Sequence, residues 1–238
     1  RPGLETIGIF SFSNSNIQSI DFPNTLYSIG KNAFENCSLL THINLSTYLT
    51  IIPEYTFYNC VKLTSVENIS KIIIIEQYAF ANCSELINFD FLESIQSIHN
   101  NVFENFSLLS NISFGEQIIF IGHSCFKNCS QLNNINLQNI TDIQNNTFEN
   151  CTSLSNIILD NLLTNLGSSC FKNCTNLHYL HLPDSVITIN ERAFENSGLY
   201  DISFSNSLQT IGPYSFYNCN NLTNVKITSN VNTIHEHC

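Results

Sequence analysis

Apolar residues recur at a fixed period along the whole chain. A phenylalanine stands every 22 or 23 residues, an aliphatic residue lies five positions before it, and an asparagine follows two positions after it. A period of this length is typical of a solenoid, in which each repeat forms one turn that packs on its neighbours. We call these phenylalanines the anchors; they are Phe12, Phe34, Phe57, Phe80, Phe103, Phe126, Phe148, Phe171, Phe194 and Phe216.

Each repeat also contains a short segment of alternating apolar and polar residues, of the form L-x-x-I-x-L. Leu132, Ile135 and Leu137 are one example. This alternation predicts a short β-strand with its apolar side chains directed inward. Because every repeat brings its strand to the same place, we expect the strands to pair in parallel, about 4.8 Å apart. The sequence thus predicts a solenoid with one strand per repeat and a continuous apolar core.

An asparagine at the same position of every repeat suggests a structural role. A carboxamide both donates and accepts hydrogen bonds, so it can satisfy peptide groups that a buried turn removes from water. We therefore predict a core-facing asparagine ladder rather than a ligand site. Its members are Asn14, Asn36, Asn59, Asn82, Asn105, Asn128, Asn150, Asn173, Asn196 and Asn218.

The complete repeat is I-G-x-x-x-F-x-N-C-x-x-L-x-x-I-x-L, seen from Ile121 through Phe126 and Asn128 to Leu137. It resembles the BspA-like, or Treponema pallidum type, leucine-rich repeat over essentially the whole chain from Ile7 onward. The resemblance implies a right-handed superhelix of about ten repeats with a parallel β-sheet on its concave face. It also implies a surface or secreted protein of mucosal bacteria or protists, of a kind implicated in adhesion to host matrix and cells.

We expect residues 1–238 to form a single leucine-rich repeat domain. The pattern stops at Cys238, just before the place of the next anchor, so we expect the domain to be a fragment, truncated at its C-terminus and also at its N-terminus. The longest purely aliphatic run is Ile72 to Ile75, too short to span a bilayer. No membrane insertion is therefore expected within this segment.

The charge balance excludes some partners. The chain has 8 basic and 19 acidic side chains and a net charge of -11, so it lacks the basic surface that nucleic acids and anionic membranes require. Asparagine, serine and threonine supply most of its polarity. A protein or a glycan is the expected partner.

Cysteines occupy repeat positions too. Seven of the ten directly follow a ladder asparagine, which favours free buried thiols, although an oxidised framework stays open as an alternative. The pairs Cys125/Cys129 and Cys170/Cys174 follow the repeat spacing rather than that of a zinc site. We expect no metal site and no cofactor; His235, His237 and Cys238 are the weaker alternative.

Two surfaces are candidate binding sites. Side chains that flank the central strand isoleucine point outward, and most of them are small and polar. At Ile158, Tyr179 and His181, larger apolar or aromatic side chains take the place of these small polar ones. Tyrosine is a preferred anchor in binding sites. The predicted ligand-binding residues are Asn134, Asn136, Asn156, Ile158, Tyr179 and His181.

The second surface lies on another face, at positions between two core aliphatic residues where other repeats carry serine or threonine. If these apolar side chains are exposed, they would form a lateral interface for self-association. Alternatively, the local turn covers them. The open ends of the solenoid are a second possible surface for self-association. These residues are Ile51, Ile73, Ile74, Ile119 and Phe120.

No nucleophile, base and orienting group occur in a pattern that predicts catalysis, and we expect no enzyme within these residues. The first hypothesis is a cell-surface or secreted adhesin-like protein that contacts host cells or matrix. The alternative is a cytoplasmic scaffold for protein–protein interaction. Glycosylation sequons outside the ladder, such as those at Asn44 and Asn111, would be used only in the first case.

Overall fold

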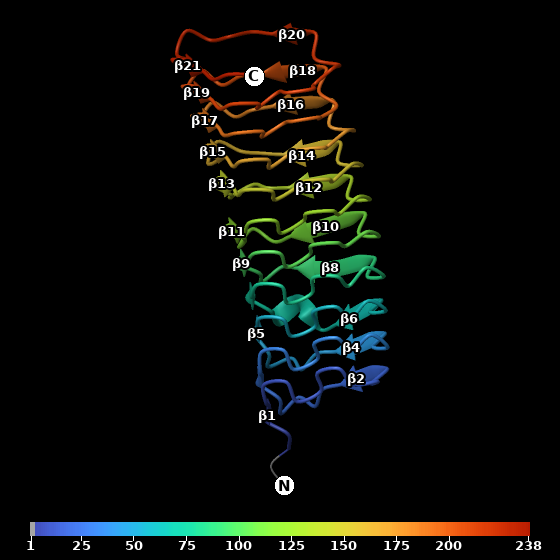
Figure 1. Cartoon of the computed structure of the whole chain (residues 1–238). Helices are drawn as coiled ribbons and strands as arrows, with labels where there is room; N and C mark the ends of the chain where they lie inside the picture. Colours follow the sequence, from blue (N-terminus) through green and yellow to red (C-terminus); the bar gives the residue numbers. More distant parts are fainter. Residues whose placement is uncertain (1–2) are drawn as a thin grey trace.

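The chain winds as one stack of short coils, each formed by one repeat, with the N-terminus at one end of the stack (Figure 1). The computed structural model describes residues 3–238, and the side chains of all of these except 88–91. Every strand pairing is parallel and joins one coil to the next. The predicted parallel-strand solenoid is confirmed.

One face carries the strands that the L-x-x-I-x-L segments predict, and we call it the strand face. Outside β8, whose side chains 88–91 are not described, the residue at the central apolar position is buried or half-buried in every strand except β20, where Val225 is exposed. The strands form three sheets, of orders β2-β4-β6, β14-β12-β10-β8 and β16-β18-β20. Their bounds are β2 Ser19–Asp21, β4 His42–Asn44, β6 Ser65–Glu67, β8 Asn88–Leu92, β10 Asn111–Phe114, β12 Asn134–Asn136, β14 Asn156–Ile158, β16 Tyr179–His181, β18 Asp201–Ser203 and β20 Asn224–Val225.

A second line of strands, which the sequence did not predict, runs along another side of the stack. We call it the second face. Each strand has two residues, of which the second is buried except in β21. A 3-10 helix, η1 (Ile69–Lys71), precedes β7. The bounds are β1 Thr6–Ile7, β3 Ser28–Ile29, β5 Ile51–Ile52, β7 Ile74–Ile75, β9 Ser97–Ile98, β11 Phe120–Ile121, β13 Asp142–Ile143, β15 Asn165–Leu166, β17 Thr188–Ile189, β19 Thr210–Ile211 and β21 Thr233–Ile234.

The anchor phenylalanines stack on one another through the centre of the core. From Phe12 to Phe80 and from Phe103 to Phe216, ring centroids of successive anchors lie 5.1 to 5.5 Å apart, with interplanar angles between 2° and 23°. The anchors from Phe34 to Phe194 are fully buried, whereas Phe12 at the open end is 38% exposed. Aromatic burial of this kind is the largest apolar contribution that each coil makes to the core.

The ladder asparagines stand in the turn after each anchor, with φ between 57° and 66°. Asparagine tolerates this left-handed conformation better than most residues. Side-chain amides of successive coils also bind each other: Asn128 Nδ2 donates to Asn105 Oδ1 at 2.7 Å, and Asn150 Nδ2 donates to Asn128 Oδ1 at 2.7 Å. Seven such bonds occur among the described residues, from Asn14 to Asn196.

The predicted asparagine ladder is present, but its orientation and partners differ from the expectation. The amides do not face the core; they lie at a half-buried edge, and those of Asn14 and Asn218 are exposed. The peptide groups of the turn are satisfied by the neighbouring coil's backbone instead, as when Asn128 N donates to the Glu149 carbonyl at 2.8 Å. The ladder therefore joins side chains to side chains, beside a separate backbone ladder.

The cysteines that follow the ladder asparagines are free thiols, and all but Cys238 of the ten cysteines are buried. Each thiol of this column donates to the carbonyl of the anchor in the preceding coil, as Cys151 Sγ does to Phe126 O at 3.1 Å and Cys174 Sγ to Phe148 O at 3.2 Å. Burial raises the pKa of the Cys129, Cys151 and Cys174 thiols above their ordinary value. These cysteines are thus weak donors that link neighbouring coils.

Truncation of a central anchor should destabilise the solenoid strongly. We expect Phe148→Ala to lower the free energy of unfolding by about 3–5 kcal/mol, because it removes a fully buried ring from the stack. Phe12→Ala is the matched control, since its ring is already 38% exposed, and should cost less than half as much. Urea unfolding followed by circular dichroism measures both; equal losses would contradict the role of the stack.

Stability should fall at alkaline pH. The folded-state pKa of the buried thiols is raised, so the folded state keeps its protons while the unfolded state loses them above about pH 9. The stability that the protonated thiols contribute to the folded state is complete below that pH. Above it, the free energy of unfolding falls by up to about 1.4 kcal/mol per pH unit for each thiol. Urea midpoints from pH 7 to 10 measure the loss. A Cys129→Ser, Cys151→Ser, Cys174→Ser variant should show a shallower pH dependence; an unchanged slope would contradict the assignment.

Candidate functional site

The six predicted ligand-binding residues all point outward from the strand face and are exposed. In β12 and β14, Asn134 lies beside Asn156, and Asn136 lies beside Ile158. Tyr179 and His181 stand on β16, which pairs with β18. Among the described residues no pairing joins β14 to β16, so the structure divides the six between two sheets of the face.

Tyr179 is the centre of an aromatic group that the sequence revealed only in part. It is 71% exposed, and its ring centroid lies 6.1 Å from that of Tyr200. The His178 ring packs on Tyr200 at 4.8 Å with an interplanar angle of 35°. We call His178, Tyr179 and Tyr200 the aromatic platform. His178 and Tyr200 each occupy the position just before a strand. The alternating pattern of the strand does not include that position, so the sequence did not indicate it as part of the binding face.

A row of carboxamides lies beside the platform along the strand face. Asn134 Nδ2 donates to Asn111 Oδ1 at 3.1 Å, across two neighbouring strands. Asn136 Nδ2 donates to Gln138 Oε1 at 3.1 Å, and the Gln138 backbone N–H donates to Asn136 Oδ1 at 3.1 Å. These internal bonds fix the amide orientations, so the row offers an ordered set of donors and acceptors to a partner.

A hollow of about 580 Å³ opens next to the platform, between β18 and β20 and the segments that follow them. Asp201 belongs to this hollow and pairs in register with Tyr179 of β16. Asp201 flanks the central isoleucine of β18 and so points outward, but the sequence gave no sign of the hollow. Other lining residues are Ser203, Phe204, Asn224, Lys226 and Thr228.

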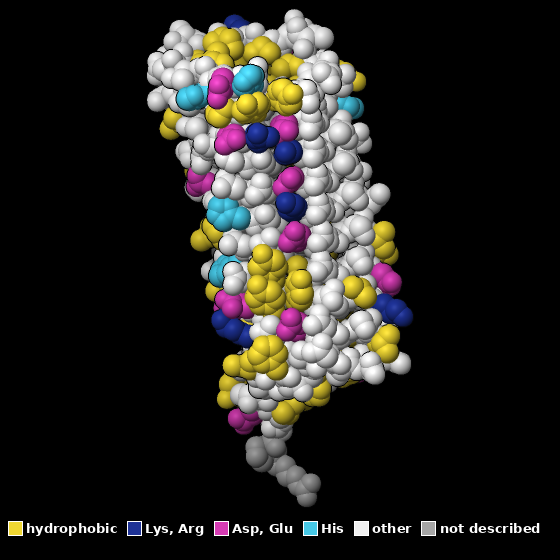
Figure 2. Space-filling view, in the orientation of Figure 1, with side chains coloured by type: hydrophobic (Ala, Val, Ile, Leu, Met, Phe, Trp, Pro, Cys, Tyr) yellow, Lys and Arg dark blue, Asp and Glu magenta, His cyan; other side chains and the backbone are white. Residues whose placement is uncertain are grey.

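Paired charges are concentrated on a different side of the solenoid. Figure 2 shows a column of acidic and basic side chains along the stack, with hydrophobic side chains grouped below it. Lys127 Nζ lies 2.8 Å from Glu149 Oε2, and Lys172 Nζ lies 3.1 Å from Glu195 Oε2. The side chains of these two pairs are only 10% to 31% exposed. Because these cations are already paired with carboxylates, they are not free to bind an anionic partner.

The second predicted surface is at least partly open to solvent. On the second face Ile51 is 41% exposed, Ile119 64% and Phe120 38%, whereas Ile73 and Ile74 are half-buried. Ile51 lies directly beside Ile74 in the pairing of β5 with β7. A depression of about 410 Å³ near this patch is lined by Ile9, Tyr27 and Ile51, among others.

Within the described part of the chain, no three histidine, cysteine, aspartate or glutamate side chains come together as a metal-binding group. The ring of His237 instead stacks on that of Tyr214, with centroids 4.8 Å apart. The described residues also include no helix of the length and apolarity that a membrane span requires.

Residues 5–133 and 141–238 match the family described as BspA type Leucine rich repeat region, in 6 copies. The chain belongs to the BspA type leucine-rich repeat family. Among curated protein sequences, nothing matches.

Solved structures of other leucine-rich repeat proteins have the same fold. A leucine-rich repeat protein from Bacteroides ovatus is 28% identical, with a TM-score of 0.77 over 92% of this chain and 63% of its own. One from Eubacterium ventriosum is 17% identical, with a TM-score of 0.64 over 96% of this chain and 83% of its own. The T. pallidum leucine-rich repeat protein is 21% identical, with a TM-score of 0.50 over 92% of this chain and 82% of its own.

This BspA type chain therefore spans less than two thirds of the Bacteroides ovatus protein. The shared architecture is a leucine-rich repeat solenoid, a fold of the kind that binds proteins on an extended surface rather than one built around a catalytic pocket.

Proposed function

We propose that this BspA type solenoid is an adhesin-like protein of the cell surface, which contacts host cells or matrix through its strand face. The aromatic platform is the observation that carries the proposal. Tyr179 is 71% exposed and is held on strand β16 with its ring open to a partner. Tyrosine supplies a large, rigid contact with a polar tip, which makes it frequent among residues that dominate binding energy.

Rigidity of the surface supports the same proposal. Tyr179 and His181 stand two residues apart on β16, which is held in register against β18, and Asn134 and Asn156 are placed side by side by the register of β12 against β14. A partner that binds such a face does not have to order loops, so less of the contact energy is lost on association. The surrounding carboxamides supply a polar rim that can bind a protein or a glycan.

Surface location is the expected setting for this family. A cytoplasmic protein–protein interaction scaffold is the second candidate, and the absence of disulfides among the described cysteines favours it, because reduced thiols are typical of the cytosol. Both candidates use the same face, but they differ in the compartment.

Location can be tested on the source cells. We expect an antibody to this segment to stain intact cells, because an adhesin must be accessible from outside. A permeabilised sample serves as the control for antibody function. Staining that occurs only after permeabilisation would replace the surface proposal with the intracellular scaffold.

Binding through the strand face can be tested with immobilised matrix proteins and surface plasmon resonance. We expect Tyr179→Ala to weaken the binding roughly thirtyfold, as the loss of a central aromatic contact does, and His181→Ala to weaken it less. Tyr48→Ala is the matched control: Tyr48 is 67% exposed but lies off the strand face, so its loss should change little. Equal effects of the Tyr179 and Tyr48 variants would contradict the proposed site.

A further inference from the structure

The second face changes character along the stack. Its surface is made of the first residue of each two-residue strand and the residue before it. In the coils up to Phe120, six of the twelve residues at these positions are apolar. In the coils from Thr141 onward, Ile187 is the one apolar residue among the ten at these positions, and Asp142 is the one charged residue. The polar half is otherwise built from hydroxyls and carboxamides, such as Thr164, Asn165, Thr188, Gln209, Thr210 and Asn232.

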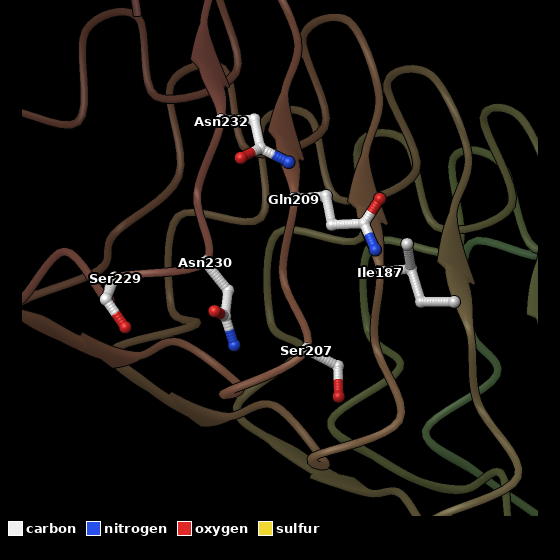
Figure 3. A pocket seen from close by; sticks show the side chains of 6 residues that line it. All are labelled: Ile187, Ser207, Gln209, Ser229, Asn230 and Asn232. Carbon is white, nitrogen blue, oxygen red and sulfur yellow. The ribbon is translucent and has the colours of Figure 1, made fainter.

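A depression of about 440 Å³ lies in this polar half, away from the strand face. Figure 3 shows the six side chains around it, which come from three successive coils. One coil contributes Ile187 and the next Ser207 and Gln209, and the last contributes Ser229, Asn230 and Asn232. Its volume is within the usual range of small-molecule sites.

Small side chains create this space. Ser207 stands three residues before β19, and the equivalent residue of the coil before β15 is Leu162, which is 50% exposed. The coil between them has Ser185 at this position, whose hydroxyl is turned to the Leu163 carbonyl at 2.5 Å. Two serines in succession therefore leave a gap, and Asn230 in the next coil closes its rim.

The lining offers many hydrogen bonds and no charge. Gln209 and Asn232 are exposed, and their carboxamides have no hydrogen-bond partner within the described chain. Asn230 Nδ2 donates to the Asn206 carbonyl at 2.5 Å, which fixes that side chain and leaves its oxygen as an acceptor. Ser207 and Ser229 add hydroxyls, while Ile187, 40% exposed, supplies one apolar surface.

We propose that this depression binds an uncharged saccharide unit. Sugar hydroxyls both donate and accept, as carboxamides and serine hydroxyls do, so the two sets are complementary. Ile187 would contact the C–H groups of the sugar ring. A phosphate or carboxylate would meet no lining cation. An apolar ligand would displace water from the side chains of Ser207, Gln209, Ser229 and Asn232 and would offer them no hydrogen bond in return. The site stands apart from the strand face and does not depend on the function proposed for it.

The test uses an array of immobilised neutral, sialylated and sulfated oligosaccharides, followed by titration of the strongest neutral binder. We expect neutral glycans to bind, and the dissociation constant to rise about tenfold or more in a Gln209→Ala, Asn232→Ala variant that loses two bonding side chains. Ser207→Leu should abolish binding, because the larger side chain fills the depression. The variant should still fold, since the equivalent position of another coil carries Leu162.

Gln96→Ala is the matched control, because Gln96 is an exposed glutamine at the same repeat position as Gln209 but outside the depression. It should leave the affinity unchanged, and so should Tyr179→Ala on the strand face. The proposal is overturned if the native chain binds no neutral glycan or only charged ones, if binding survives Ser207→Leu, or if Gln96→Ala weakens it as much as the double variant does.

Discussion

Stacking of one anchor phenylalanine on the next is the contact on which the rest of the solenoid depends. Successive ring centroids stay within 5.1 to 5.5 Å, so each coil must return to the same place after 22 or 23 residues. Once the rings are in register, the groups on either side of them are in register too. The thiol of Cys151 then meets the Phe126 carbonyl, and the Asn150 amide meets that of Asn128. A side chain that suits one coil therefore suits the same position in the next, which is why phenylalanine and asparagine recur there.

This arrangement separates what holds the fold from what faces the solvent. The core and the ladders use the same few residue types in every coil, whereas the outward strand positions vary freely, from Asn134 to Tyr179 to Asp201. Each coil interacts mainly with its two neighbours, so a surface change in one coil has little effect on distant ones. Binding properties can thus be concentrated locally, as we propose for the aromatic platform on the strand face and for the uncharged depression on the second face.

Much of the fold was predictable because ten copies repeat the same signal. The anchors, the strand-face strands and the ladder positions were all placed correctly from the sequence. The second line of strands was not, because two residues such as Ile51 and Ile52 are too short to show an alternation. The hydrogen-bond partner of each ladder amide was not predictable either. It depends on the direction in which the turn points the side chain, which is set by the left-handed backbone conformation with φ near 60° and is not revealed by the residue type alone. For the candidate site, Tyr179 was found from its bulk, whereas Tyr200 and the neighbouring hollow required the geometry of adjacent coils.

The direction of the hydrogen bonds between coils has a mechanical consequence. The ladders connect one coil to the next along the length of the stack, so a pull applied at its two ends would load them one coil at a time rather than all together. The solenoid would then lengthen in steps, each releasing a coil of 22 or 23 residues. At full extension such a coil reaches roughly 75 Å, many times the thickness it has in the stack. A tether built in this way can give way gradually under strain and keep its remaining coils folded.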